Sequence, residues 1–322
     1  MRQNNLLALL WSMLKAIFVG MVIAAVVIIG YRFVATTNVS MSSQKTISEE
    51  DPEDSSVITR FSREFISSPD DSKEIIEQAK NSLPKPANSK ISAKSYVVIN
   101  LDTNVVVLEK DADKLQPLAS VTKLVTAIIA RKLIDQNKYV TIDQKILGVY
   151  GSEGNLRFGE KLRVGELMYP MLMVSSNDSA EAVAQAYDPG RDKFIKEMNI
   201  WVNSIGAYRT YFKDASGLSP QNVSTAQDLS IIIQWVLKND PEILDITLLK
   251  SKTIRTHTWT NPTHFLNLTS YIGGKNGYTP EADRTSVSLF KIGKYKRTYG
   301  VILLGSSQRD SDTLDLLDEA LR

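Results

Sequence analysis

The chain has 322 residues, 43% of them hydrophobic, so it can bury a substantial core in one large domain or in two smaller ones. Its 38 basic and 36 acidic residues leave a net charge of +2, which gives no indication of a nucleic-acid partner. The lack of cysteine excludes disulfides and cysteine nucleophiles, and two histidines without an H-E-x-x-H or G-x-S-x-G motif argue against zinc peptidases and α/β-hydrolases.

The N-terminal stretch AIFVGMVIAAVVIIGY, residues 16–31, carries no charge and is flanked by Lys15 and Arg32. With neighbouring apolar residues it approaches the ~20 residues of a membrane-spanning helix. A cleaved signal peptide is the alternative, although no A-x-A cleavage site follows. Since Arg2, Lys15 and the amino group precede the span, we expect residues 1–36 to form an uncleaved, single-pass anchor in the lipid bilayer of the cell membrane, with the rest of the chain extracytoplasmic.

Residues 37–90 are rich in serine, acidic in SEEDPEDSS and interrupted by prolines in SLPKPANSK. This composition predicts a flexible extracytoplasmic tether between the anchor and the rest of the chain. One short helix is possible over residues 72–81, with Ile75, Ile76 and Ala79 on its apolar side.

Residues 91–322 have the pattern of one folded head. The head opens with SYVVINLDTNVVVLEK, two β-rich runs that flank a turn and predict a hairpin. Helical patterns dominate residues 120–237, and strand-like runs at 285–292 and 298–304 precede a closing helix at 311–321. Strands at both ends with helices between them predict an α/β (α+β) fold, in which one sheet is completed by both ends of the head and covered by helices.

Among the Ser-x-x-Lys pairs of the chain, those at 42/45, 120/123 and 288/291 are compared first. The first lies in the polar tether and the third in a strand-like run, where positions three apart face opposite sides of a sheet. Of these three pairs, only Ser120 and Lys123 begin a helical pattern, where positions three apart share a face and a hydroxyl can touch an amine. The alternative is that Ser120 only caps the helix and Lys123 is solvated. A lysine acts as a base near neutral pH only if burial or a second cation lowers its pKa.

Two later stretches supply a second hydroxyl and a second cation: Ser175-Ser176-Asn177-Asp178 and Lys275-Asn276-Gly277. Together with PLASVTKLVTAIIA, they resemble the S-x-x-K, S-x-N and K-T-G boxes of the penicillin-binding serine D-alanyl-D-alanine carboxypeptidases, in the same order. FKDASGLSPQNVSTAQDLS and GVILLG also resemble family segments, so the likeness covers roughly residues 95–305. The resemblance implies a β-lactamase/transpeptidase-like fold with an antiparallel sheet between helices, and a catalytic domain over 91–322.

The resemblance also implies a role for each box residue. Ser120 is the nucleophile that is acylated, Lys123 accepts its proton, and Ser175 relays a proton to the leaving D-alanine. Asn177 orients the peptide and steadies Lys123. Lys275 binds the terminal carboxylate of the substrate and keeps Lys123 neutral by like-charge repulsion.

The third box is the place where this chain departs from the family pattern. The family has Thr or Ser at the middle position, whereas this chain has Asn276, whose planar amide is longer but can still donate to a carboxylate. Gly277 allows a substrate backbone to approach, and the resemblance assigns the oxyanion to the backbone amides of Ser120 and Tyr278. A second departure is Asp283, where the family usually has glycine.

The resemblance predicts a carboxypeptidase that removes the terminal D-alanine from peptidoglycan stem peptides, is acylated by β-lactams and needs no metal or cofactor. A catalytically impaired, membrane-tethered binder of cell-wall peptides remains open because of Asn276. A serine β-lactamase is disfavoured because its candidate glutamate, Glu197, lies in an amphipathic helical pattern. We interpret His257 and His264 as structural residues, and Asp214 as a turn residue.

Overall fold

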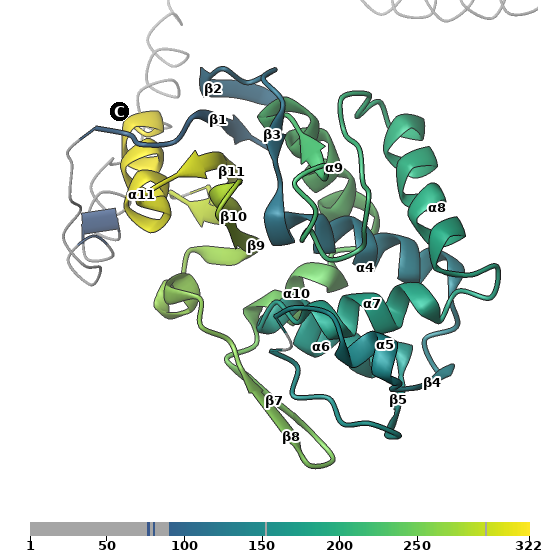
Figure 1. Cartoon of the computed structure of the whole chain (residues 1–322). Coiled ribbons are helices and arrows are strands. Elements are labelled where there is room, and N and C mark those ends of the chain that lie inside the picture. The colour runs from purple at the N-terminus through teal and green to yellow at the C-terminus, as the bar shows by residue number, and fades with distance from the viewer. Residues whose placement is uncertain (1–75, 78–79, 81–89, 152, 294) are drawn as a thin grey trace, which may run out of the picture. The chain divides into compact units, whose positions relative to one another are not determined.

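The computed structural model describes residues 76–77, 80, 90–151, 153–293 and 295–322 (Figure 1). The chain separates into two units, residues 1–66 and 67–322, and every described residue belongs to the second unit. The expected anchor and most of the expected tether lie outside the described residues. Among the residues that are described, no helix is both long enough and apolar enough to cross a membrane.

The centre of the second unit is a five-stranded antiparallel sheet with the strand order β2-β1-β11-β10-β9. Its strands are β1 (Ser95–Asn100), β2 (Val105–Lys110), β9 (Tyr271–Thr279), β10 (Asp283–Ile292) and β11 (Arg297–Ser306). The predicted hairpin is present as β1 and β2, and β1 pairs with β11 from Ser95↔Leu304 to Asn100↔Tyr299. The head therefore closes its sheet with strands from both ends, as predicted.

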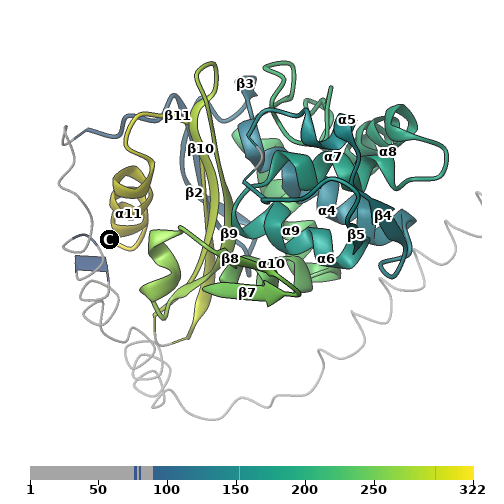
Figure 2. The same cartoon turned by 60° about the horizontal axis from the view of Figure 1, so that its bottom comes forward.

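The sheet is covered on both faces, as Figure 2 shows. Alternate residues of β1 enter different cores because strand side chains point to opposite faces. Val97 and Ile99 join the larger core with the central helices, whereas Val98 joins a smaller core with Leu314 and Leu317 of α11 (Arg309–Ala320). Burial on both faces agrees with the continuous apolar run at residues 301–304 of β11, whereas β10 also buries the polar residues Thr285, Ser286 and Ser288.

Between β2 and β9 the chain is mainly helical. This part contains η1 (Ala119–Val121), α4 (Thr122–Leu133), α5 (Gln144–Leu147), α6 (Val164–Met173), α7 (Asn177–Gln185), α8 (Arg191–Ser204), α9 (Ala226–Asn239), α10 (Glu242–Leu248) and η2 (His264–Asn267). This part also contains three two-stranded sheets. They pair β3 (Gln116–Pro117) with β6 (Val223–Ser224), β4 (Tyr139–Thr141) with β5 (Lys161–Arg163), and β7 (Ser251–Ile254) with β8 (His257–Thr260). Helix α4 is buried from Thr122 to Ala130, which makes it the central helix of the larger core.

The folded head includes residues that the sequence placed in the tether. Ile76 is only 2% exposed and packs in the smaller core beside α11. The Nζ atom of Lys80 lies 2.9 Å from a carboxylate oxygen of Asp315 and 3.4 Å from one of Asp318. Burial of the isoleucine and the two ion pairs of the lysine thus hold these two positions against α11.

Candidate active site

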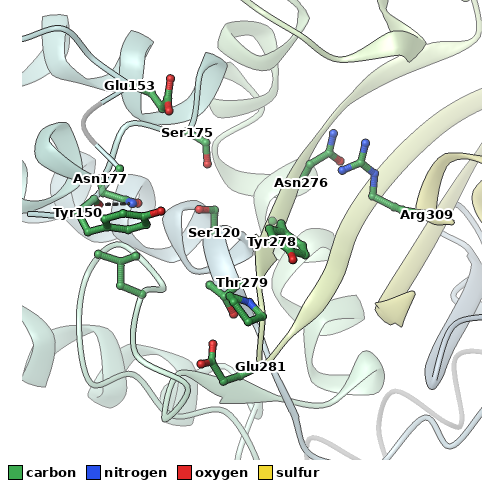
Figure 3. Close-up of a pocket in the computed structure, with 14 residues that line it drawn as sticks. Ser120, Tyr150, Glu153, Ser175, Asn177, Asn276, Tyr278, Thr279, Glu281 and Arg309 are labelled. Carbon is green, nitrogen blue, oxygen red and sulfur yellow. Dashed lines mark hydrogen bonds between the residues drawn. The ribbon is translucent and has the colours of Figure 1, made fainter. Parts of the chain in front are cut away.

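A cleft of about 570 Å³ lies where the helical part meets the free edge of β9 (Figure 3). Its walls come from η1, from the loop after α5, from the start of α7, from β9 and from the beginning of α11. Ser120, Ser175, Asn177, Asn276, Gly277 and Tyr278 all line it. Six of the eight residues that the sequence singled out therefore border one cavity, and the other two, Lys123 and Lys275, are buried beneath it.

Lys123 is held by three short contacts beneath Ser120. Its Nζ lies 2.7 Å from Ser120 Oγ, 2.6 Å from Asn177 Oδ1 and 2.7 Å from the backbone oxygen of Ser216. Asn177 Oδ1 and Ser216 O are acceptors only, so they take two N–H groups of the amine. In the neutral amine, the remaining lone pair then faces the hydroxyl of Ser120, which is the geometry that a general base requires.

The surroundings of Lys123 favour this neutral form. Its side chain has no exposed surface. Burial lowers the pKa of Lys123 well below its usual range, and the nearby ammonium of Lys275 lowers it further. Asp214 and Asp178 oppose the shift, since their charges favour the ammonium form. The balance provides an amine that can accept a proton near neutral pH, and Ser120 makes a side-chain contact with it instead of capping α4.

Lys275 is the second buried amine of the site. Its Nζ lies 2.9 Å from Ser175 Oγ and 2.7 Å from the backbone oxygen of Asn276. Burial, with a smaller contribution from the charge of Arg309, lowers the pKa of Lys275 to about 7. Lys275 of the third box thus contacts Ser175 of the second box directly. The charge of Lys275 also lowers the pKa of Lys123.

The spacing of the second box follows from the turn that begins α7. Ser175 has a φ of 64°, in the left-handed region, so its side chain turns into the cleft (Figure 3). Ser176 is the N-cap, and its hydroxyl accepts from the amide of Ser179. Asn177, the first residue of α7, points back to Lys123. One turn therefore directs Ser175 toward Lys275 and Asn177 toward Lys123.

Two glycines allow backbone segments to reach Ser120. A Cβ on Gly277 would lie 2.7 Å from the backbone nitrogen of Ser120, and one on Gly217 would lie 1.8 Å from the backbone oxygen of Ala119. Side chains at these positions would push β9 and the loop at residues 214–219 away from the nucleophile. Tyr278 follows Gly277 directly and also lines the cleft.

Asp214 organises the loop that supplies the acceptor for Lys123. Its carboxylate accepts from the amides of Ser216 at 2.9 Å, Gly217 at 2.6 Å and Ser219 at 2.6 Å. These contacts hold the backbone oxygen of Ser216 at Lys123. Asp214 is thus a turn residue, as the sequence indicated.

Several residues of the cleft were not found from the sequence. Arg309, the first residue of α11, lies beside Asn276 (Figure 3). Tyr150 accepts from Asn177 Nδ2 through its backbone oxygen at 2.8 Å, and Glu153 and Glu281 also line the cavity. Nothing in the local pattern marks these positions, because loops and the strand order of the sheet bring them to the site.

The side chain of Asn276 faces the cleft next to Arg309. Its Oδ1 is buried, and no described residue hydrogen-bonds to it. A buried polar atom without a partner is costly, about 1–3 kcal/mol. The substitution in the third box thus leaves an unmet acceptor at the cleft wall.

The two histidines lie outside the cleft and have structural contacts. His257 is buried, bonds to Glu160 at 2.8 Å and stacks on Trp259, whose Nε1 donates to the backbone oxygen of Gly154. His264 contacts Asp310 at 2.8 Å. Among the described residues, no three His, Asp or Glu side chains are grouped so that they could hold a metal ion. Glu197 lies on α8 and does not line the cleft.

Comparison with known proteins finds D-alanyl-D-alanine peptidases. A D-alanyl-D-alanine endopeptidase of Escherichia coli is 33% identical over 181 residues, which cover 55% of this chain and 56% of that protein. An endopeptidase of Haemophilus influenzae is 31% identical over 238 residues, covering 70% of this chain and 81% of its own. This chain therefore spans from about half to four fifths of these curated relatives.

Solved structures show the same fold. A D-alanyl-D-alanine carboxypeptidase from Mycobacterium tuberculosis has a TM-score of 0.66 and 27% identity, with 74% of this chain and 92% of that chain covered. A mutant of the Streptomyces K15 DD-transpeptidase has a TM-score of 0.65 and 26% identity, with 73% and 98% covered. Residues 79–304 match the family described as D-alanyl-D-alanine carboxypeptidase. This match takes in more than half of the chain, and the chain therefore belongs to the D-alanyl-D-alanine carboxypeptidases of peptidase family S11.

Proposed function

We propose that the protein is a serine peptidase that removes the terminal D-alanine from peptidoglycan stem peptides through an acyl-enzyme. One observation carries the proposal: the buried Nζ of Lys123 lies 2.7 Å from Ser120 Oγ, while its two other contacts are with acceptors. An amine in this setting can take the proton of the hydroxyl. Family membership and the names of the relatives support the substrate class.

In the acylation step, Ser120 Oγ attacks the carbonyl carbon between the two D-alanines, and its proton passes to Lys123 Nζ. The backbone amides of Ser120 and Tyr278 stabilise the oxyanion of the tetrahedral intermediate. The C–N bond then breaks as the leaving amine receives a proton through Ser175, and D-alanine departs. In the second step, water attacks the ester carbon and Lys123 accepts a proton from that water. Lys123 returns the proton to Ser120 Oγ as the ester C–O bond breaks, and the shortened peptide leaves with a free carboxyl group.

The cationic end of the cleft binds the terminal carboxylate of the substrate. Lys275 and Arg309 supply positive charge there, and the amide nitrogen of Asn276 supplies a donor. β-Lactams place a carboxylate and an amide bond in similar positions, so they acylate the same hydroxyl. The acyl-enzyme with a β-lactam is the expected inhibited form.

The location of the protein follows from the N-terminal pattern. The uncharged segment at residues 16–31, with more basic groups before it than after it, anchors the chain in the cell membrane and leaves the head outside. Peptidoglycan lies on that side of the membrane, so the substrate and the cleft share a compartment. The tether between them gives the head lateral reach along the wall.

A second candidate is a binder of cell-wall peptides that is acylated but does not turn over, which the unpartnered Oδ1 of Asn276 favours. One experiment separates the two. Full-length protein in detergent is labelled with a fluorescent penicillin, and D-alanine release is measured from a pentapeptide stem. Labelling with release supports the carboxypeptidase, and labelling without release supports the binder. Absence of both would overturn each of them.

A further inference from the structure

Three charged side chains line the cleft: Arg309, Glu153 and Glu281. Arg309 already contacts a carboxylate, since its Nε lies 2.5 Å from Asp310. Both glutamates are exposed, and no described residue forms an ion pair with either of them. The wall of the cleft thus carries two carboxylates that are free to meet a positive charge on a ligand.

The two ends of the β9 wall have opposite charge. β9 is an edge strand that pairs only with β10 in the sheet, so its other edge faces the cleft. Asn276, beside Arg309, lies at one end of this wall, and Glu281 follows the strand at the other end (Figure 3). Gly277, between them, lies against the nucleophile. A peptide bound along this edge meets a cationic group on one side of Ser120 and an anionic group on the other.

This arrangement fixes the direction of a bound peptide. Its terminal carboxylate belongs at the cationic end, near Asn276 and Arg309, so an extended peptide runs antiparallel to β9. The residues before the scissile bond then lie along Tyr278, Thr279 and Glu281. The Cα of the residue that precedes the two D-alanines lies about 5 Å from the acyl carbon, and a side chain of four to five bonds extends about 6 Å further. Thr279, the last residue of β9, comes two residues after Gly277, or about 7 Å along the strand, and Glu281 lies in the turn that follows it.

We infer that Glu281 is a specificity-determining residue that binds a free amine on the side chain of the residue preceding the two D-alanines. The inference rests on the proposed function and narrows its substrate class to stem peptides that carry an unblocked amino side chain at that position. When the amine is acylated, as in a cross-link, its positive charge is lost and the contact with Glu281 disappears. The protein therefore prefers uncross-linked stems as acyl donors.

Two substrates that differ only in this charge test the inference. They are Nα-acetyl-L-Lys-D-Ala-D-Ala with a free ε-amine and the same peptide with the ε-amine acetylated. The full chain is assayed for D-alanine release at low ionic strength, and the readout is the ratio of the two kcat/KM values. For an exposed ion pair, we expect a preference of about two- to fivefold for the free amine, which shrinks in 0.5 M salt.

Variants locate the carboxylate that produces the preference. Glu281→Gln should bring the ratio to about one, and Glu281→Lys should invert it by like-charge repulsion. Glu153→Gln is the matched control, because it removes a carboxylate from the same cleft but near Ser175, and it should keep the preference. A ratio of one in the unmodified protein, or a preference that persists in Glu281→Gln, would overturn the inference while D-alanine release upholds the proposed function. No release from either peptide would overturn the proposed function, and the inference with it.

Discussion

The two walls of the cleft are built differently. On the helical wall, Lys123 has no exposed surface, and each of its three contacts is 2.7 Å or shorter. On the β9 wall, Lys275 keeps a pKa of about 7, and the Oδ1 of Asn276 has no partner among the described residues. The base is therefore fully paired before a substrate arrives, whereas on the β9 wall Lys275 is paired with Ser175 and Asn276 but the Oδ1 of Asn276 remains unmet. A base that is already held in position lowers the free energy of the transition state, because no group has to reorganise during the reaction. A polar group without a partner adds to affinity when a ligand supplies the missing hydrogen bond.

Replacing the nucleophile should have the largest effect on acylation and little effect on stability. Ser120→Ala removes the only hydroxyl within 2.7 Å of Lys123 in the described part of the chain, so penicillin labelling should disappear. The melting temperature should change little, because the substitution leaves the contacts of Lys123 with Asn177 and Ser216 intact. Labelling is followed on a denaturing gel, and unfolding by calorimetry.

Ser42→Ala is the matched control for this variant, since Ser42 begins another Ser-x-x-Lys pair. It should be labelled like the unmodified protein. If Ser120→Ala still formed the covalent adduct, the nucleophile would have to be a different residue.

Lys123→Arg should keep the positive charge and lose the base. A guanidinium cannot give up its proton near neutral pH, and it is too large for a site with three contacts of 2.7 Å or less. We expect the acylation rate to fall by about 10²- to 10⁴-fold, the range that a general base contributes. Stopped-flow measurement with a chromogenic β-lactam gives the rate. Lys291→Arg, at an exposed lysine of the third Ser-x-x-Lys pair, should be unaffected.

The pH dependence of kcat/KM should report the titration of Lys275 on the β9 wall. Lys275 with a pKa of about 7 is charged below that pH and neutral above it, so attraction for the terminal carboxylate weakens as the pH rises through 7. Lys123 acts in the opposite direction, because protonation at low pH removes the base. We expect kcat/KM for the peptide to fall by up to about tenfold on the alkaline side.

Lys275→Arg tests the assignment of this alkaline fall, since arginine stays charged throughout the range. The fall should disappear in the variant, even if the maximum rate is lower. An alkaline limb that remains at the same pH would mean that another group titrates there.

The helical wall was largely predictable from the sequence because its signals are local. Three positions on one helical turn bring Ser120 to Lys123, and the capped start of α7 sets the directions of Ser175 and Asn177. The strands β1, β10 and β11 were also predictable, because each contains β-branched or aromatic residues that are typical of strands.

The β9 wall was less predictable. YIGGKNGYT contains three glycines and an asparagine, which are poor strand formers, so β9 was recognisable only through the family resemblance. Arg309 begins α11, which follows β11, and it reaches the cleft because β11 lies two strands away from β9 in the sheet. No local sequence pattern predicts this strand order. Glu281 was missed for a similar reason, as only the edge position of β9 makes its carboxylate part of a cleft.

The smallest expected effect concerns the residue that departs from the family. Asn276→Thr replaces a buried amide oxygen that has no described partner by a shorter hydroxyl, which can donate to the substrate carboxylate. Because the hydroxyl replaces the longer amide donor and leaves no buried oxygen unmet, kcat/KM should rise by about three- to tenfold. Asn276→Ala is the control, because it removes the unmet oxygen together with the amide donor, and its kcat/KM should not rise above that of the unmodified protein.

Whether kcat/KM rises or falls in Asn276→Thr shows which group of the ligand the β9 wall recognises. A rise means that the amide merely impairs a wall that is otherwise shaped for the D-alanine carboxylate. A fall means that the amide oxygen is an acceptor kept for a donor on the ligand, in which case the β9 wall recognises a different C-terminal group from the one proposed. Parallel acylation rates with penicillin distinguish a change in peptide recognition from a change at Ser120, since both reactions pass through the same hydroxyl.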